Sequence, residues 1–299
     1  MLELALLYKS LDRNCFTVLK VLDSMLSKYE YVPVEVIEKK SKLPPKVLAR
    51  ALTKLNKIKA IIRASTPKTG YRLTYIGLDL LALHYLSNTG VIAYLGTKVG
   101  MGKESEIYIA KNPEGQLLAV KFYKIGRVSF QRVKRVRSYL VDEANWMIRS
   151  KVTAEREYKA LKDLIKFTPY VPKPYGWNRH AVVLSYISGI ELYRYKVAID
   201  PKGLLEKILS TLREAYLNVG IVHGDLSEYN VVVSIEGDNE VPYIIDWPQY
   251  VYKDDPTHEA LLRRDVEYVL KFFKRRYRVI IDVERAIRYV RGEAEKPWA

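Results

Sequence analysis

The chain has 299 residues, a length typical of two domains, and its single cysteine, Cys15, excludes an internal disulfide and fits a reducing compartment. The net charge of +16 favours a polyanionic partner such as nucleic acid, although a charged, heat-adapted surface is the alternative. The four histidines are scattered, which argues against a zinc site. The amino terminus does not resemble a signal peptide and no apolar run reaches roughly 18 residues, so we expect a soluble, cytoplasmic monomer with no membrane partner.

The pattern of residues 1–90 predicts a winged helix. Apolar residues recur at helical spacing in three successive stretches, and Pro44 and Pro45 suit the first turn of the third, where a missing N–H costs nothing. Two β-prone runs then flank a T-P-K-T-G turn as the wing, and Thr74 can cap a closing helix. The expected helices cover about 6–25, 33–41, 43–56 and 75–86.

The third helix of a winged helix is its recognition element. In this chain the third helix and the wing carry a set of basic side chains, and roughly half of the net charge lies in residues 1–90. This concentration favours contact with a phosphate backbone, while a protein-binding winged helix with a solvated basic face stays open as the alternative. The basic residues are Lys46, Arg50, Lys54, Lys57, Lys68 and Arg72.

A strand-turn-strand pattern begins at Val91, in the sequence V-I-A-Y-L-G-T-K-V-G-M-G-K-E-S-E-I-Y-I-A. Gly100 and Gly102 predict a tight turn whose backbone can approach phosphates, and Lys103 and the Ser105 hydroxyl can then reach them. No helix with G-K-[ST] follows, so the segment is not a P-loop. Strand-turn-strand is instead the arrangement of the glycine-rich loop in protein kinases.

Lys121 ends the A-V-K sequence of a third apolar strand, where a lysine is costly unless a carboxylate pairs with it. The helical stretch T-A-E-R-E-Y-K-A-L-K-D-L supplies that carboxylate. Glu157 is the expected partner, and Glu155 is the lesser candidate.

Two carboxylates and an amide follow in the sequences V-H-G-D-L-S-E-Y-N and Y-I-I-D-W-P-Q. Asp225 and Asn230 have the spacing of the protein-kinase catalytic loop, where the Asp orients the substrate proton and the Asn holds a metal. Asp246 follows the next apolar strand, at the place of the metal-binding Asp. Oxygen ligands suit Mg²⁺, with Mn²⁺ as a substitute. Alone this stretch is also consistent with a polar turn, but its order after the glycine turn, A-V-K and the helical Glu favours a phosphoryl-transfer site.

With these motifs in order, the chain resembles the Rio-type atypical serine/threonine protein kinases. Within them it is similar to the subfamily with an amino-terminal winged helix, Rio kinase two, in a short archaeal-type form. The resemblance covers nearly the whole chain through G-M-G-K-E-S, A-V-K, V-P-K-P, A-V-V-L-S-Y-I, H-G-D-L-S-E-Y-N and I-D-W-P-Q. It implies an α+β fold: a winged helix over 1–90, then a two-lobed kinase domain with an N-lobe over 91–187, a C-lobe over 188–299, and ATP between the lobes.

The resemblance also implies a role for each matching residue. Asp225 is the expected catalytic Asp, and Asn230 and Asp246 are the expected metal ligands. Asp246 is also expected to accept phosphate transiently, which makes the chain more an ATPase than a kinase. His223 is interpreted as structural. The residues expected to bind ATP are Gly100, Gly102, Lys103, Ser105, Lys121 with Glu157 bracing it, and the backbone of Ser185 and Ile187.

The implied biological role is late maturation of the small ribosomal subunit, with the winged helix and a basic flexible loop at 124–150 on ribosomal RNA or protein. A merely solvated loop stays open, and Ser129 is a candidate self-phosphorylation site. The stretch 261–290 predicts two basic amphipathic helices, interpreted as lobe helices with a solvated face. Gly224 replaces the Arg of H-R-D and no activation segment follows, so no peptide platform is evident and a nucleotide-driven switch is favoured.

Two alternative functions, each from another class of protein, are also considered. Small-molecule phosphotransferases of the aminoglycoside type also carry H-G-D, a later Asn and I-D-W, but G-M-G-K-E-S and the winged helix argue against them. The second is a nucleic-acid-binding regulator with an inactive kinase fold. A chemically competent residue at every catalytic position argues against that reading.

Overall fold

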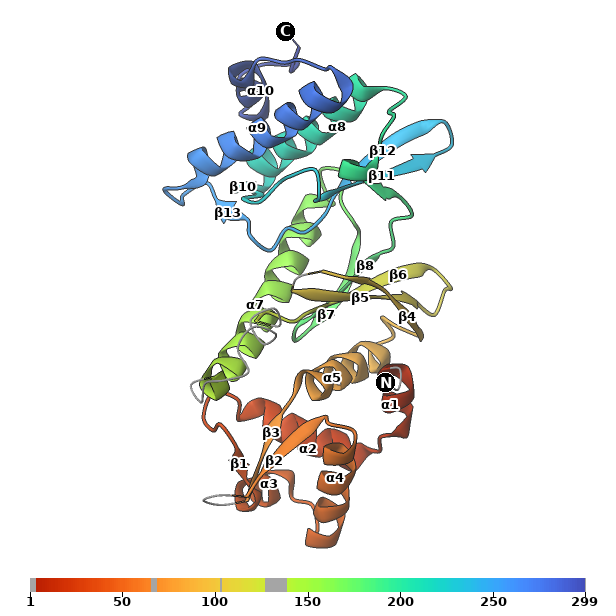
Figure 1. The fold of residues 1–299 in the computed structure, drawn as a ribbon, viewed down its shortest axis with the longest axis vertical. Coiled ribbons are helices and arrows are strands. Elements are labelled where there is room, and N and C mark those ends of the chain that lie inside the picture. Colours follow the sequence, from red (N-terminus) through yellow and green to blue (C-terminus); the bar gives the residue numbers. More distant parts are fainter. Residues whose placement is uncertain (1–3, 66–68, 103, 127–138, 299) are drawn as a thin grey trace. The chain divides into compact units, whose positions relative to one another are not determined.

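The computed structural model describes residues 4–65, 69–102, 104–126 and 139–298. The chain divides into two compact units (Figure 1). The amino-terminal unit holds Met1–Glu155 and Tyr175–Val183, and the carboxyl-terminal unit holds Arg156–Pro174 and Leu184–Ala299. The predicted winged helix therefore shares one unit with the strands that directly follow it in the chain. No helix in the described ranges is long and apolar enough to cross a membrane.

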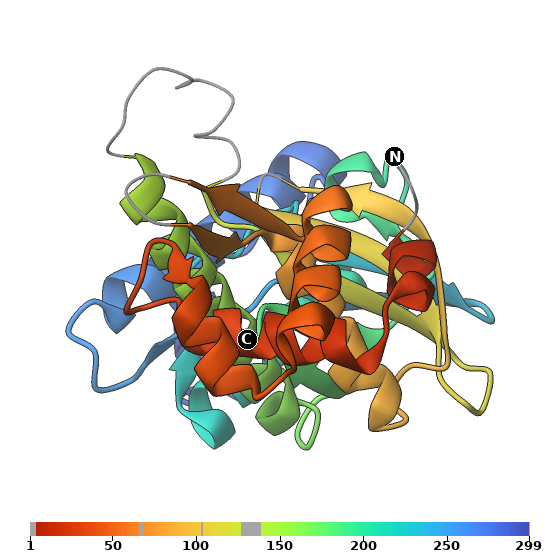
Figure 2. The ribbon, with the colours of Figure 1, turned by 90° about the horizontal axis from the view of Figure 1, so that it is seen from below.

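Helices and a small sheet form the winged helix, coloured red to orange in Figure 2. The prediction of one first helix over 6–25 is wrong, because Asp12 interrupts it. Its carboxylate accepts a hydrogen bond from the Cys15 backbone N–H at 2.9 Å and begins a new helix. The strands pair antiparallel in the order β1-β3-β2. The elements are α1 (Leu4–Ser10), α2 (Arg13–Ser24), β1 (Val32–Pro33), α3 (Val34–Ser41), α4 (Pro45–Lys57), β2 (Ile61–Ala64), β3 (Gly70–Leu73) and α5 (Tyr75–Asn88).

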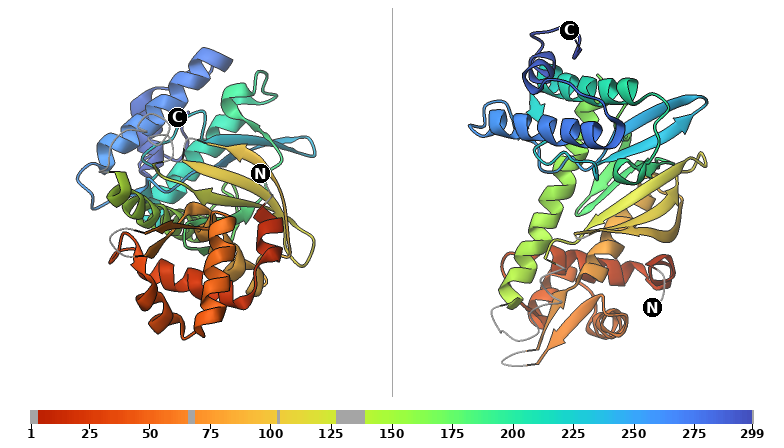
Figure 3. Two further views of the ribbon diagram at one scale, coloured as in Figure 1. Left: turned by 60° about the horizontal axis from the view of Figure 1, so that its bottom comes forward. Right: turned by 45° about the horizontal axis from the view of Figure 1, so that its top comes forward.

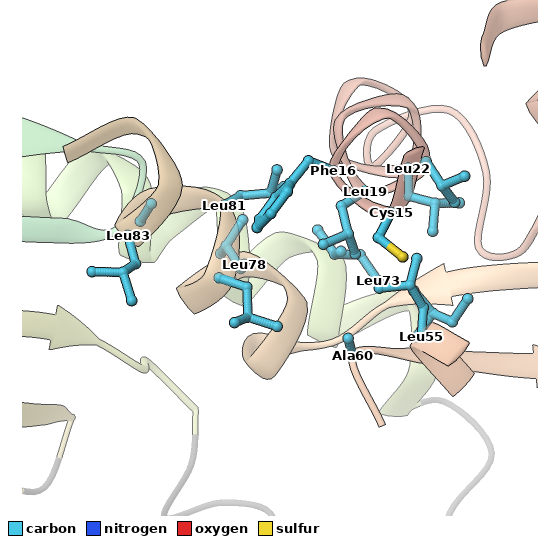
Figure 4. Close-up of a cluster of buried hydrophobic side chains, with 14 of the residues drawn as sticks. Cys15, Phe16, Leu19, Leu22, Leu55, Ala60, Leu73, Leu78, Leu81 and Leu83 are labelled. Atoms are coloured by element: carbon cyan, nitrogen blue, oxygen red, sulfur yellow. The ribbon is translucent and has the colours of Figure 1, made fainter. Parts of the chain in front are cut away.

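The core of the winged helix is an apolar cluster between these helices and the sheet (Figure 4). Leu19 of α2, Leu55 of α4 and Leu78 of α5 are fully buried in it. Each leucine buried in this way contributes about 1.5–3 kcal/mol. The predicted cap is confirmed: the Thr74 hydroxyl accepts a hydrogen bond from the Gly77 N–H at 3.3 Å, which fixes where α5 begins.

A five-stranded sheet with the strand order β4-β5-β6-β8-β7 follows. The glycine turn predicted at Gly100 to Gly102 is shifted toward Ser105. β4 includes Gly100, and the Gly102 N–H closes the turn on the Ser105 carbonyl at 2.9 Å. The strands are β4 (Tyr94–Met101), β5 (Ser105–Lys111), β6 (Leu117–Tyr123), β7 (Pro174–Asn178) and β8 (Ala181–Ser185).

The long helix α7 (Tyr139–Leu164) lies between β6 and β7 in the chain. The loop predicted over 124–150 is therefore wrong for 139–150. The reason is that E-A-N-W-M-I-R leads into the T-A-E-R-E helix without Gly or Pro to break it. Ser129 lies outside the described residues.

The carboxyl-terminal unit packs α8, α9 and α10 against one another (Figure 3). Two small antiparallel sheets accompany them, with the orders β12-β11-β9 and β10-β13. Helices α9 and α10 confirm the prediction of two helices over 261–290. The elements are β9 (Ile190–Glu191), η1 (Leu192–Arg194), α8 (Pro201–Glu214), η2 (Ala215–Val219), β10 (Ile221–Val222), β11 (Val231–Glu236), β12 (Asn239–Ile244), β13 (Val251–Tyr252), α9 (His258–Tyr277) and α10 (Val283–Val290).

Candidate active site

Gly100 and Lys121 lie in one row across the sheet of the amino-terminal unit. The register sets Gly100 opposite Ile107 on β5, and Ile107 opposite Lys121 on β6. Opposite residues on antiparallel strands share a face of the sheet, so the glycine and the lysine point to one side. A Cβ at Gly100 would meet Ile107 at 3.6 Å, an ordinary contact. Crowding by described residues therefore does not require glycine here, and the role of Gly100 in letting a phosphate approach the backbone stays a prediction.

Ser105 begins β5 directly after the glycine turn. A Cβ on Gly102 would lie 3.2 Å from the Ser105 hydroxyl oxygen, so the missing side chain leaves room beside that hydroxyl. This is the local arrangement expected of a phosphate contact. Lys103, the other predicted phosphate-binding residue of the turn, lies outside the described residues.

The ammonium group of Lys121 lies over the Tyr123 ring, 4.7 Å from the ring centroid. Its predicted partner, Glu157, is fully buried in α7, whereas Glu155 is half-buried. Burial of a carboxylate is costly unless it is compensated, so Glu157 is the better candidate for an ion pair. Lys121 and Glu157 belong to different units, and their pairing stays a prediction.

The two predicted adenine contacts, Ser185 and Ile187, lie at the end of β8 and in the loop after it. The Ser185 N–H donates to the Lys173 carbonyl at 2.8 Å, and the Ser185 hydroxyl accepts from the Lys173 N–H at 3.0 Å. Because the Ser185 N–H already has a partner, the Ser185 carbonyl is the backbone group of this residue that can contact a ligand. The Ile187 N–H makes no backbone hydrogen bond within the described part of the chain and suits a ligand acceptor.

Asp225, Asn230 and Asp246 come together within the carboxyl-terminal unit. The Asn230 side-chain NH₂ donates to the Asp225 carbonyl at 2.7 Å. The pairing of β11 with β12 continues through the Ile245 N–H, which donates to the Asn230 carbonyl at 2.9 Å. Asp246 is the next residue, so the strand pair brings it to the catalytic loop.

Asp225 is perturbed electrostatically by its surroundings, which include Asp246. Partial burial raises the pKa of Asp225, the Arg264 guanidinium opposes that rise, and the negative charge of Asp246 adds to it. Asp246 also has a left-handed backbone, with φ of +66°, which costs a non-glycine residue about 1–3 kcal/mol. Perturbed carboxylates and backbone strain of this kind are concentrated at functional sites.

The donor atoms of this cluster fit Mg²⁺. Because the Asn230 nitrogen is held by a carbonyl, its side-chain oxygen is the atom oriented to act as a ligand, together with the Asp246 carboxylate. Mg²⁺ is usually held by one or two such protein ligands plus substrate phosphates, whose charge it neutralises. Among the described residues no group of three or more His, Cys, Asp and Glu can hold a metal.

His223 supports the catalytic loop from the core. Its Nδ1 accepts a hydrogen bond from the Asp225 N–H at 3.2 Å, so its Nε2 carries the proton and donates to the Ile245 carbonyl, also at 3.2 Å. The fully buried ring lies 4.6 Å from the Trp247 ring. These contacts agree with the interpretation of His223 as a structural residue.

Gly224 explains why this loop reads H-G-D. Its φ is +80°, a left-handed conformation that favours glycine, and a Cβ there would lie 2.7 Å from the Gln249 carbonyl oxygen. No arginine, nor any other side chain, fits without moving the backbone of one of the two segments. The departure from H-R-D is therefore a consequence of the segment after Asp246 packing closely on the loop.

Asp265 of α9 is a site residue that the sequence analysis missed. Its two carboxylate oxygens accept hydrogen bonds from the Gly224 N–H at 2.7 Å and the Leu226 N–H at 3.1 Å, and Arg264 donates to the Gly224 carbonyl. Burial raises the pKa of Asp265 to about 6. The feature of the sequence that could have identified Asp265 is the position of this carboxylate on the apolar stripe of α9, one position before the buried Val266.

A second missed group is a buried charge cluster in the amino-terminal unit. The Lys124 ammonium lies 2.8 Å from the Asp79 carboxylate and 2.7 Å from that of Glu106, and His180 Nε2 lies 2.7 Å from Asp79. Burial acts to lower the pKa of Lys124, but the attraction of Asp79 and Glu106 raises it overall. The cluster joins α5 of the winged helix to β5, next to Ser105.

Two family models match the chain: the RIO domain over residues 106–286, and the Rio2 N-terminal domain over residues 8–89. The RIO-type serine/threonine-protein kinase Rio2 of Methanocaldococcus jannaschii is 36% identical over 274 residues, which cover 88% of this chain and 98% of that protein. The serine/threonine-protein kinase rio2 of Dictyostelium discoideum is 32% identical over 272 residues, which cover 90% of this chain and 51% of that protein.

Solved structures agree with these matches. The complex of Rio2 kinase with ADP, Mg²⁺ and phosphoaspartate from Chaetomium thermophilum has a TM-score of 0.84 at 28% identity, covering 99% of this chain and 91% of that one. A second Rio2 kinase structure from the same organism has a TM-score of 0.82 at 30% identity, covering 97% and 90%. The predicted resemblance and the α+β fold with a winged helix are thereby confirmed, and the ADP and Mg²⁺ of the first structure are bound by that protein.

Proposed function

The chain belongs to the Rio2 family of RIO-type serine/threonine-protein kinases, and on that premise we propose that it uses ATP in late maturation of the small ribosomal subunit. The observation that carries the proposal is the presence in one chain of a phosphoryl-transfer cluster, Asp225, Asn230 and Asp246, and a basic winged helix. The family match also argues against the small-molecule phosphotransferase alternative.

In this proposal the γ-phosphoryl group of ATP passes to the Asp246 carboxylate. An Asp246 oxygen forms a bond to the γ-phosphorus while the bond from that phosphorus to the β,γ-bridging oxygen breaks, and ADP leaves. Water then attacks the acyl phosphate, which regenerates the carboxylate and releases inorganic phosphate. The phosphoaspartate in the Chaetomium thermophilum Rio2 structure supports this route.

Asp225 serves the steps in which a proton has to leave. A carboxylate that attacks phosphorus has no proton to lose, whereas a water molecule or a serine or threonine hydroxyl has one. The raised pKa of Asp225 makes it a better proton acceptor than an ordinary aspartate. We therefore assign Asp225 to hydrolysis of the acyl phosphate and to transfer to hydroxyl acceptors.

The winged helix is proposed to bind ribosomal RNA through α4. Lys46, Arg50 and Lys57 are exposed on that helix. Arg72 of the wing instead lies over the Tyr31 ring, 5.4 Å from its centroid, and Lys68 lies outside the described residues. If five phosphates are neutralised, log affinity for single-stranded RNA falls with log salt at a slope of about −3.5. A flat salt response would exclude the RNA contact.

The test is ATP turnover by the purified chain with and without immature small ribosomal subunits, compared with Asp225→Ala, Asp246→Ala and the control Asp238→Ala. Asp238 is an exposed carboxylate in the β11–β12 turn of the same unit. We expect both active-site variants to lose turnover, the control to keep it, and subunits to change the native rate. An ATP turnover rate that does not change when subunits are added would refute the ribosomal role. It would not contradict the assignment of the phosphoryl-transfer site.

A further inference from the structure

The carboxyl-terminal unit has a groove beside its catalytic loop. Two adjoining hollows of about 730 and 290 Å³ share Tyr193 and Arg276 among their lining residues. The first follows β9 and η1, and the second follows the catalytic loop and the carboxyl end of α9. We call the combined hollow the Tyr193–Arg276 groove.

The groove shares a loop with the catalytic residues. Glu228 and Tyr229 line it, and both stand between Asp225 and Asn230 in the sequence. The Tyr193 N–H donates to the Glu228 carbonyl at 3.1 Å, and the rings of Tyr193 and Tyr229 are 4.7 Å apart. The groove is therefore lined by the same loop that carries Asp225, three residues before Glu228.

Two of the four cations that line the groove are available for a ligand. The two glutamates of the lining already have partners, Arg194 and Arg275, each at 3.4 Å. Lys196 and Arg276 are exposed, and in the described chain neither has a carboxylate within ion-pair distance. The groove thus presents unpaired positive charge, which favours an anionic occupant.

An acidic polypeptide suits this groove better than RNA does. A serine or threonine acceptor has to reach Asp225, so the peptide on either side of it must lie along the neighbouring surface. Tyr193 and Tyr229 are 41% and 60% exposed and give that peptide an apolar wall. Their rings pack on each other and leave no space to sandwich a base between them. The guanidinium of Arg276 can bind a carboxylate through two parallel hydrogen bonds.

We propose that the Tyr193–Arg276 groove binds the acidic flank of a protein substrate, with Lys196 and Arg276 holding Asp or Glu side chains near the serine or threonine acceptor. This inference rests on the proposed function and names the substrate class of the same site. The groove supplies a peptide platform in a chain whose sequence shows no activation segment.

Binding is measured by fluorescence anisotropy with the full chain, ADP and Mg²⁺. The probes are a fluorescein-labelled serine peptide flanked by aspartates and the same peptide with asparagines. The variants are Arg276→Gln, Arg276→Glu and Lys196→Ala. Lys274→Ala is the matched control, since Lys274 is exposed on α9, carries the same charge and does not line the groove. Thermal melting of each variant checks that it is folded.

We expect the aspartate peptide to bind about tenfold more tightly than the asparagine peptide, and Arg276→Gln to remove most of that difference. Arg276→Glu should weaken aspartate binding further, while Lys274→Ala should leave it unchanged. Equal binding of the two peptides, or an equal loss in Lys274→Ala, would overturn the proposal. The proposal would also be overturned if a folded Arg276→Glu variant no longer bound a single-stranded RNA oligomer but still bound the peptide. The groove would then be an RNA-binding surface. Peptide binding is measured without ATP turnover. A failure of the groove proposal can therefore be distinguished from a failure of the proposed ATPase cycle.

Discussion

The backbone N–H of Gly224 donates to the carboxylate of Asp265 at 2.7 Å, which ties the catalytic loop to α9 from a position 41 residues away. Asp265→Asn keeps the size of the side chain but replaces one accepting oxygen with a donor, so the loop loses a charge-assisted hydrogen bond. We expect ATP turnover to fall about 10- to 100-fold, because small misplacements of catalytic groups have effects of that size. Glu267→Gln, an exposed change on the same helix, is the control; equal rates in the two variants would contradict the positioning role.

Asp265 also makes the free energy of unfolding depend on pH. Burial raises the folded-state pKa of Asp265 to about 6, above its ordinary value of 3.8. Between those values the folded state binds the proton and the unfolded state does not, so this group's contribution to stability is complete below pH 3.8 and is lost as pH rises through 6. The shift corresponds to about 3 kcal/mol.

Urea denaturation of the native chain and Asp265→Asn, at several pH values between 4 and 7, measures that contribution. The free energy of unfolding of the native chain minus that of the variant should decrease as pH rises across this range. A difference that is constant with pH would show that Asp265 titrates at its ordinary value.

Gly224→Ala should damage the site more than an equally strained glycine elsewhere. Its φ of +80° disfavours a side chain, and the new Cβ would also press on the Gln249 carbonyl oxygen. Gly237 has φ of +62° with nothing within 4 Å of a Cβ, so Gly237→Ala carries the strain alone, about 1–2 kcal/mol. We expect Gly237→Ala to keep ATP turnover and Gly224→Ala to lose it, with a larger drop in melting temperature; similar melting temperatures would refute the close packing.

Local sequence was sufficient for the parts of the site that lie within one motif. The spacing of Asp225 and Asn230, and the strand before Asp246, predicted which side chains gather in the carboxyl-terminal unit. Asp265 was missed because its contact depends on the placement of α9 in three dimensions, and no fixed spacing links it to H-G-D. The first helix was also predicted too long, because the apolar pattern runs through Asp12 and conceals its role as a cap.

The buried cluster of the amino-terminal unit was missed for the same reason. Asp79 lies 45 residues from Lys124 and 101 from His180 in the sequence, and none of the three belongs to a recognisable motif. In the sequence Lys124 was assigned to a basic loop, where a lysine is expected to be solvated. The structure instead buries it, with 8% of its surface exposed, between two carboxylates.

Lys124→Met tests the energetic weight of that cluster. Removal of the cation takes away the buried charge that Asp79 and Glu106 share and leaves them weaker contacts, including those with His180 and the partly exposed Lys98, which should lower the free energy of unfolding by about 3–5 kcal/mol. Lys98→Met is the matched control, because Lys98 also contacts Glu106, at 3.3 Å, but its side chain is 39% exposed. The control should cost less than about 1 kcal/mol. Equal costs in denaturant titrations of the two variants would contradict the buried pairing.

The most direct measurement is the chemical identity of the phosphate that the chain retains from ATP. After incubation with γ-labelled ATP and Mg²⁺, the protein is denatured, one portion is treated with hydroxylamine, and the labelled peptides of an untreated portion are mapped. Transfer to Asp246 predicts a label that hydroxylamine removes, on the peptide with the I-I-D-W-P-Q sequence, and that is absent in Asp246→Ala. A label that resists hydroxylamine, lies on serine or threonine, and persists in Asp246→Ala would contradict Asp246 as the phosphate acceptor.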